Sequence, residues 1–253
     1  MNPERPRHLP LYLSAGSPCG YLESRQSRNL FVDPDVAMNT VLYGQLLRRG
    51  FRRSGRLVYR PHCDHCRQCL SVRVPVQGFE LKRRFRRVIE ANRDLSVTPR
   101  PAAFMSEHYD LYRRYTAARH AEGSMQDSSP AEYADFLMAD WCDTHFVEIR
   151  REQQLLAVAV TDQLEDGLSA VYTFFAPEES ARSLGTFAIL TQIQLARQWD
   201  LPHLYLGYWV RDCRKMSYKA DFRPLQLFSE GEWREFALGE QLRVTELQDE
   251  DAP

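Results

Sequence analysis

The stretch from residue 146 to residue 228 most constrains what this chain can fold into, because its hydrophobic pattern changes period twice. Phe146–Arg150, Leu155–Thr161 and Leu168–Phe175 have the length and apolar character of strands, and short turns join them. The second turn contains Asp166-Gly167, which is a strong signal for a tight hairpin. Three strands linked in this way predict an antiparallel sheet.

A helix from Leu184 to about Trp199 is predicted next, and it is apolar on most sides, which indicates burial. Ser183 is expected to cap it. A strand at His203–Gly207, a short helix and a last strand near Leu225–Phe228 complete the pattern. This order resembles the Gcn5-type N-acyltransferase fold. We therefore predict an α+β protein with an acyltransferase-like C-terminal domain and a smaller Cys-containing N-terminal domain.

The boundary between the two domains is expected near residue 100, where Thr98-Pro-Arg-Pro101 has the composition of a linker. Residues 1–100 would form the Cys-rich, basic domain, and residues 101–253 the catalytic domain with an acidic C-terminal tail. The first 28 residues are expected to be irregular. The remaining expected elements are strands at Arg56–Arg60 and Ser71–Val76 and helices at 80–93, Ser106–Ala121 and Pro130–Asp140.

The net charge of −1 conceals a strong asymmetry along the chain. Between Arg48 and Arg93 there are fourteen Lys and Arg residues against three acidic ones, whereas the tail from Ser229 onward has eight acidic residues against two Arg. A basic block of this kind is typical of a protein that binds a phosphate backbone. The basic faces of the predicted helix at 80–93 make Lys82, Arg83, Arg86 and Arg87 the candidate phosphate contacts.

Composition also limits the setting in which the chain works. Six cysteines in 253 residues do not make the disulfide framework of a small secreted protein. No apolar run is long enough to span a bilayer, and the N-terminus lacks the apolar segment of a signal peptide. We expect a protein of the reducing cytoplasm, with no membrane partner and no DNA partner.

Three cysteines form a Cys-x-x-Cys-x-x-Cys run, Cys63, Cys66 and Cys69, and Cys19 lies upstream. Two thiolates at this spacing suit tetrahedral zinc, and Cys19, His62 or His65 could supply a fourth ligand. An iron–sulfur centre is an alternative, and so is a set of reduced thiols in a loop. The tentative metal ligands are Cys19, Cys63, Cys66 and Cys69.

The region from Tyr205 to Pro224 concentrates cations and aromatic rings, a combination suited to a surface that holds phosphates and a base. With other segments, it resembles the arginyl-tRNA–protein transferase family, and within it the bacterial branch that transfers leucine. The matching segments are Cys19-Gly-Tyr-Leu22, Tyr59-Arg-Pro-x-Cys63-x-x-Cys66-x-x-Cys69, Ser183-Leu-Gly-Thr186, Tyr205-Leu-Gly-Tyr-Trp209 and Lys215-Met-x-Tyr-Lys219. Leu22 stands where eukaryotic relatives have a second cysteine, which favours the bacterial branch.

The resemblance implies an enzyme that moves leucine from leucyl-tRNA to the α-amine of proteins beginning with Asp or Glu, which marks them for N-degron degradation. The resemblance implies that the transfer itself requires no cofactor, and it makes the four basic residues of the helix at 80–93 the candidate tRNA contacts. The acidic acceptor needs cations, for which the candidates are Arg28, Arg182, Arg211, Lys215 and Lys219. Candidate catalytic residues are Tyr208 and Tyr218, as hydrogen-bond partners of the amine or oxyanion, and Asp221, to orient the amine.

Three alternatives remain open from the sequence. Arginine instead of leucine could be the donor, or the chain could be a zinc-containing RNA-binding module without catalysis. A coenzyme-A-dependent acetyltransferase would need a glycine-rich cradle at the start of the central helix. The turn Arg182-Ser-Leu-Gly-Thr186 contains a single glycine, which counts against this third class.

Overall fold

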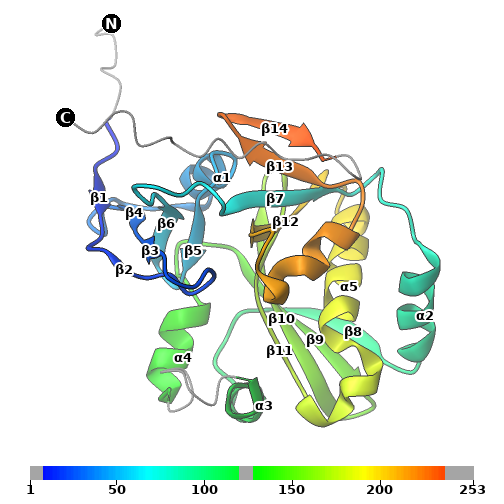
Figure 1. Cartoon of the computed structure of the whole chain (residues 1–253). Coiled ribbons are helices and arrows are strands. Elements are labelled where there is room, and N and C mark those ends of the chain that lie inside the picture. Colours follow the sequence, from blue (N-terminus) through cyan, green and yellow to red (C-terminus); the bar gives the residue numbers. More distant parts are fainter. Residues whose placement is uncertain (1–7, 120–127, 237–253) are drawn as a thin grey trace, which may run out of the picture.

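The computed structural model describes residues 8–119 and 128–236, and a mixed sheet of eight strands dominates it (Figure 1). The strand order is β14-β13-β7-β12-β11-β10-β9-β8. The strands are β7 (Leu70–Pro75), β8 (Ser96–Pro101), β9 (Thr144–Arg151), β10 (Gln154–Leu164), β11 (Gly167–Phe175), β12 (His203–Trp209), β13 (Gln226–Ser229) and β14 (Glu232–Glu235). Strand β7 comes from the N-terminal half of the chain, yet it lies between β12 and β13.

The predicted α+β class and the acyltransferase-like order of elements are confirmed. Strands β9, β10 and β11 are antiparallel neighbours, and the 3-10 helix η1 (Pro177–Arg182) and helix α5 (Leu184–Gln198) connect β11 to its parallel partner β12. A second 3-10 helix, η2 (Arg214–Asp221), then leads to β13. Ser183 is the N-cap residue of α5, as predicted, but its φ is 53° and its side chain makes no capping hydrogen bond.

Helix α5 and the N-terminal part of the chain cover opposite faces of the large sheet. Two consecutive residues of β10 show this, since neighbouring side chains of a strand point to opposite faces. The Thr161 hydroxyl accepts a hydrogen bond of 2.7 Å from the buried Gln192 amide of α5. Asp162 binds Arg53, which belongs to a smaller sheet. None of the described helices is both long and apolar enough to cross a membrane.

The smaller sheet has the strand order β1-β4-β6-β5, and a two-stranded ribbon of β2 and β3 accompanies it. These short strands correct the prediction that the first 28 residues are irregular. Helix α1 packs on this sheet through the buried residues Tyr43, Leu46 and Leu47. The bounds are β1 (Leu11–Leu13), β2 (Ser17–Pro18), β3 (Gln26–Ser27), β4 (Asn29–Val32), α1 (Thr40–Leu47), β5 (Arg52–Ser54) and β6 (Leu57–Pro61).

The predicted linker at residues 98–101 is wrong, because this segment belongs to strand β8. Its two prolines cannot donate to a ladder, which made the segment look like a linker. Strand β8 is the last strand of the sheet and pairs with β9 alone, where Pro99 faces Val147 and Pro101 faces His145. An edge position tolerates proline, since one side of the strand has no partner to satisfy.

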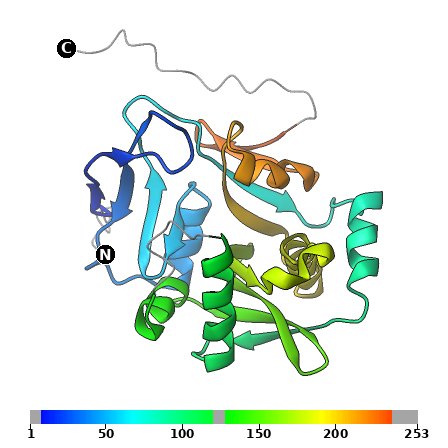
Figure 2. The ribbon, with the colours of Figure 1, turned by 60° about the horizontal axis from the view of Figure 1, so that its bottom comes forward.

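The three predicted helices of the middle region are confirmed as α2 (Arg83–Ala91), α3 (Ser106–Arg119) and α4 (Pro130–Leu137). Helix α4 begins with a capping box between Ser129 and Glu132. Tyr133 of α4 packs edge-on against Tyr112 of α3, with ring centroids 5.0 Å apart, so the two green helices lie together (Figure 2). Most of the acidic tail, residues 237–253, lies outside the described residues.

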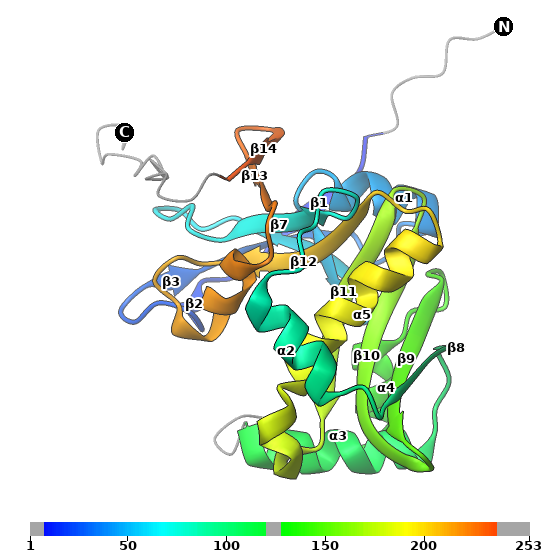
Figure 3. The ribbon, with the colours of Figure 1, turned by 90° about the vertical axis from the view of Figure 1, so that its right-hand side faces the viewer.

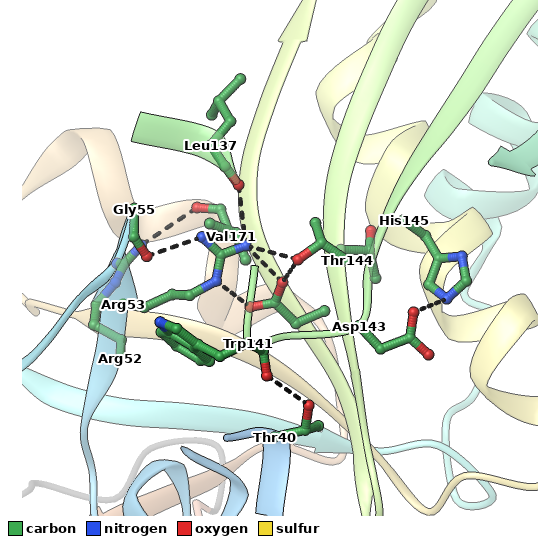
Figure 4. Close-up of polar contacts among 12 residues, drawn as sticks. Thr40, Arg52, Arg53, Gly55, Leu137, Trp141, Asp143, Thr144, His145 and Val171 are labelled. Carbon is green, nitrogen blue, oxygen red and sulfur yellow. Dashed lines mark hydrogen bonds and ion pairs between the residues drawn. The ribbon is translucent and has the colours of Figure 1, made fainter. Parts of the chain in front are cut away.

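A buried ion pair joins the smaller sheet to the large one. The guanidinium of Arg53 on β5 donates to both carboxylate oxygens of Asp162 on β10, over 2.7 Å and 2.6 Å, and both side chains are fully buried. Thr144 and the Leu137 carbonyl occupy further positions around the guanidinium (Figure 4). This bidentate pair fixes β5 against β10, because each charge is satisfied only while the two strands stay together.

Replacing Asp162 by Ala should lower the free energy of unfolding by about 3–5 kcal/mol, because it leaves the Arg53 charge buried without its partner. Urea denaturation measures this change. The control is Asp140→Ala, which removes the carboxylate from an exposed pair with Arg56. That change should cost less than about 1 kcal/mol. Equal losses in the two variants would contradict the importance given to the buried pair.

Candidate active site

The large sheet splits between β11 and β12. Three residue pairs join these parallel strands, and the last of them is Ser169 with Tyr205. Beyond that point both strands become irregular: β11 shifts register against β10 next to Val171, and β12 shifts register against β7 between Tyr205 and Gly207. Gly207 has a φ of +74°, a conformation that favours glycine. The two strands therefore diverge, and their inner backbone groups are open to other partners.

Arg52 of strand β5 enters this split. Its Nη2 donates to the Val171 carbonyl of β11 over 3.3 Å (Figure 4). Its Nη1 lies on the β12 side, where a Cβ atom added to Gly207 would come within 2.8 Å of it. A side chain at position 207 would therefore displace the guanidinium, so glycine is needed there for space as well as for its backbone conformation.

Tyrosines surround the Arg52 guanidinium. Its Cζ lies 5.6 Å from the ring centroid of Tyr208, within the range of a cation–π contact. Burial opposes the charge of Arg52, the phenol groups of Tyr59, Tyr208 and Tyr21 favour it, and the net effect raises the pKa of Arg52. Within residues 8–119 and 128–236, no carboxylate forms an ion pair with this arginine. Arg52 is thus a cation held among aromatic rings, and none of the described residues supplies it with an anionic partner.

Lys219 of η2 is a second cation at the same place. It is only 7% exposed, and its Nζ donates to the Tyr208 carbonyl over 2.5 Å. Burial and the nearby charge of Arg52 lower the pKa of Lys219 to about 7, and Cys213 opposes this shift. The ammonium therefore exchanges its proton near neutral pH, whereas Arg52 keeps its charge.

The structure brings three predicted site residues to the split, which are Lys219, Tyr208 and Tyr218. The Tyr218 ring is 43% exposed, and the Lys219 Nζ lies 6.0 Å from its centroid. The Tyr208 hydroxyl donates to the carbonyls of Gly50 and Tyr59, so its ring rather than its hydroxyl faces Arg52.

Two of the other predicted substrate contacts already have carboxylate partners. Arg28 pairs with Asp64 at 3.4 Å. Arg182 is held by Asp94 and Glu179, so its charge is compensated. Two further cations, Arg211 and Lys215, are exposed residues around the start of η2.

Asp221, predicted to orient the acceptor amine, lies at the C-terminal end of η2, and its carboxylate forms an ion pair of 2.8 Å with Arg84 of α2. This pair is about half exposed on both sides. Helix α2 also packs through Phe85 on Phe222, which follows η2, with ring centroids 4.8 Å apart, and the two helices lie side by side (Figure 3). The basic helix is therefore attached to the element that carries Lys219.

All four predicted tRNA contacts of this helix are exposed. Within the described residues none of the four forms an ion pair, whereas Arg84 pairs with Asp221. The buried side of the helix faces Phe79 and Phe222 through Phe85. The contacts in question are Lys82, Arg83, Arg86 and Arg87.

The predicted metal ligands lie near one another, and Cys213 joins them. Burial, together with the thiols of Cys63, Cys66, Cys19 and Cys213, raises the pKa of Cys69 to about 12. All are free thiols. Within the described part of the chain, no three His, Cys, Asp or Glu side chains are arranged to hold a metal ion. The zinc or iron–sulfur centre stays a prediction, and no step of the chemistry proposed below involves these thiols.

Arg52 is the residue of this site that the sequence did not single out. It lies next to Arg53 in the basic block, where fourteen Lys and Arg residues are equally plausible candidates by sequence. The available signal was Gly207, because a glycine that interrupts a strand can mark a close approach by another group. The sequence could not show which group approaches, since that depends on how β5 is fixed against the large sheet.

Two family models match most of the chain. The model described as "Arginine-tRNA-protein transferase, N terminus" matches residues 17–87, and the corresponding C-terminus model matches residues 107–229. The first therefore includes the cysteine cluster and Arg52, and the second includes the split strands and η2.

Curated relatives are similar over nearly their whole length. An aspartate/glutamate leucyltransferase of Alcanivorax borkumensis is 51% identical over 86% of this chain and 90% of that protein. A protein of the same name from Nitrosococcus oceani is 49% identical over 88% of this chain and 94% of that protein. Among solved structures, L-PGS from Bacillus licheniformis has 8% identity and a TM-score of 0.45 over 67% of this chain and 49% of that chain, a likeness too weak to support a statement about this protein.

Proposed function

Because the chain belongs to the arginine-tRNA-protein transferase family, we propose that it transfers leucine from leucyl-tRNA to the α-amine of proteins that begin with Asp or Glu. The names of relatives about 50% identical support the donor and the acceptor. The observation that carries the proposal is the pair of cations, Arg52 and Lys219, at the split between β11 and β12. An acidic acceptor would supply the anion that this pair lacks.

The reaction is the aminolysis of an ester. The neutral α-amine of the acceptor attacks the carbonyl carbon of the leucyl ester, a C–N bond forms, and the C–O bond to the ribose breaks. The amine nitrogen loses one proton, and the ribose oxygen leaves as a hydroxyl with one proton, so the protons balance. Because the ester is already activated, positioning and proton transfer can supply most of the rate.

Lys219 is the group placed to move that proton. In its neutral form it can accept a proton from the acceptor amine and return it to the ribose oxygen, and its pKa of about 7 lets both forms exist near neutral pH. The Tyr208 carbonyl holds its Nζ in place. Tyr218, half exposed beside it, offers an aromatic surface and a hydroxyl to the entering substrates.

Helix α2 would bind the tRNA arm. Its exposed cations suit phosphate contacts, and its packing on Phe222 keeps it next to η2. A tRNA held there would have its aminoacyl end close to the split. Since aminoacyl-tRNA is a cytoplasmic molecule, we place the reaction in the cytoplasm, where its products would enter N-degron degradation.

A transfer assay with labelled leucyl-tRNA and arginyl-tRNA tests the proposal, with peptides that begin with Asp, Glu or Ala. We expect leucine on the Asp and Glu peptides only. Arginine transfer would keep the family and change the donor. Binding of tRNA without transfer from either donor would favour a binding module and overturn the proposed reaction.

The pH dependence of single-turnover transfer at saturating acceptor tests Lys219. The rate should rise steeply with pH below about 7, where both Lys219 and the acceptor amine lose a proton. Above pH 7 it should rise less steeply, because only the acceptor amine is still losing its proton there. Lys219→Gln should lower the rate by about 10²–10⁴ and remove the steeper limb, leaving the ionisation of the acceptor amine at about 7.7–8.0. Arg214→Gln, an exposed cation in the same short helix, is the control. A Lys219→Gln variant with the wild-type pH profile would exclude Lys219 as the proton acceptor.

The salt dependence of tRNA binding tests helix α2. Each phosphate contact adds close to one to the slope of log K against log salt. Arg83→Ala/Arg87→Ala should therefore weaken binding and reduce the slope by up to about two. The matched control is Arg56→Ala/Arg234→Ala, which removes two exposed arginines already paired with Asp140 and Glu230. The same slope in both double variants would remove α2 from the tRNA site.

A further inference from the structure

We infer that Arg52 reads the side-chain carboxylate of the acceptor's first residue, an inference that rests on the proposed function. It makes Arg52 the specificity-determining residue for Asp and Glu. Such a residue has to be charged, accessible to a carboxylate and close to the group that handles the acceptor amine. Arg52 meets these three conditions.

Two adjacent arginines differ in how their charges are compensated. Arg53 is fully buried, and Asp162 compensates its charge through two short hydrogen bonds. Arg52 is partly buried and has a single hydrogen bond within the described residues, to the neutral Val171 carbonyl. A desolvated guanidinium without an anion is costly to maintain. A bound carboxylate would compensate that cost, whereas a neutral amide of the same shape would not.

The donor geometry of Arg52 fits a carboxylate. A guanidinium has five N–H donors in a planar fork that matches the two oxygens of a carboxylate. One donor of Nη2 reaches Val171, and Nη1 points toward Gly207, which has no side chain to block access. The Tyr208 ring against the guanidinium holds the fork in one orientation.

The position of Arg52 fits the reaction as well. The Arg52 Cζ lies 5.6 Å from the Tyr208 ring centroid and the Lys219 Nζ donates to the Tyr208 carbonyl, so both cations lie at the same residue of β12. In an N-terminal Asp or Glu, only two or three carbon atoms separate the α-amine from the carboxylate group. An acceptor with its carboxylate on Arg52 would therefore present its amine to Lys219.

A phosphate of the tRNA end is another oxyanion that a guanidinium can bind. The acceptor carboxylate is the better match, because Arg52 lies in the split beside Lys219, whereas the exposed cations of α2 are available for phosphates. The two sources predict different losses. Loss of a carboxylate contact changes the choice of acceptor, and loss of a phosphate contact changes the affinity for tRNA.

The experiment measures kcat/KM for peptides that begin with Asp, Glu and Asn, at saturating leucyl-tRNA, together with leucyl-tRNA affinity by filter binding. Arg52→Gln should lower the ratio of kcat/KM for the Asp or Glu peptide to kcat/KM for the Asn peptide by about 100-fold or more. The ratio is the readout because loss of the Arg52 charge also raises the pKa of Lys219, which affects all three peptides alike. Arg52→Lys, which keeps a charge without the fork, should keep part of the preference. Both should bind leucyl-tRNA as the wild type does.

The control is Arg73→Gln. Arg73 is also a guanidinium packed on aromatic rings, 4.4 Å from the Trp233 centroid, but its Nε donates to Gln226 and its Nη1 to Tyr205. It should keep the wild-type preference for Asp over Asn. Thermal unfolding of each variant shows whether it is folded, and Arg52→Lys supplies the test if Arg52→Gln is not.

Two results would overturn the inference while the proposed function stands. One is an unchanged preference for Asp over Asn in Arg52→Gln, or in Arg52→Lys where that variant is the test. The other is a loss of leucyl-tRNA affinity with the preference intact, which would identify a phosphate site. A wild-type protein that moves leucine to none of the acidic peptides would instead overturn the proposed function and this inference with it.

Discussion

The buried pair of Arg53 and Asp162 is the interaction on which the rest of the site depends. It fixes strand β5 of the smaller sheet against β10 of the large sheet. Because Arg52 directly precedes Arg53, the pair also sets where the Arg52 side chain enters the split between β11 and β12. The compensated charge of Arg53 thus positions the uncompensated charge of Arg52. Strand β5, which is remote in sequence from the acyltransferase-like domain, contributes a residue to the site of that domain.

The same division between satisfied and unsatisfied charge separates Arg52 and Lys219 from cations that are already paired. Arg182, Arg28 and Arg84 each have carboxylate partners, which contribute little on an exposed surface but do occupy the charge. Arg52 and Lys219 share no carboxylate among the described residues. A folded protein tolerates such a pair when one member can give up its proton, and Lys219 does so near pH 7.

The helices and strands with a clear hydrophobic periodicity were predicted correctly, whereas their boundaries were predicted less accurately. The three antiparallel strands, the buried helix α5 and strand β12 follow from local patterns. Strand β8 was missed because proline at an edge and proline in a linker look alike without knowledge of the neighbours. Of the candidate site residues, the density of cations and rings around η2 indicated Lys219 and Tyr218. Arg52 could not be recognised, since its role depends on a close approach to Gly207 across the sheet.

Burial and residue type together distinguish the cations that the sequence presents as equivalent. A guanidinium keeps its charge at any pH in the physiological range, so Arg52 suits the constant task of holding an anion. An ammonium loses its charge when it is desolvated beside another cation, so Lys219 suits proton transfer. Exchanging the two residue types would reverse both properties: a lysine beside β11 would lose part of its charge, and an arginine in η2 would be unable to accept a proton. The arrangement of one arginine and one lysine therefore follows from the two different tasks that an acidic acceptor with a reactive amine imposes.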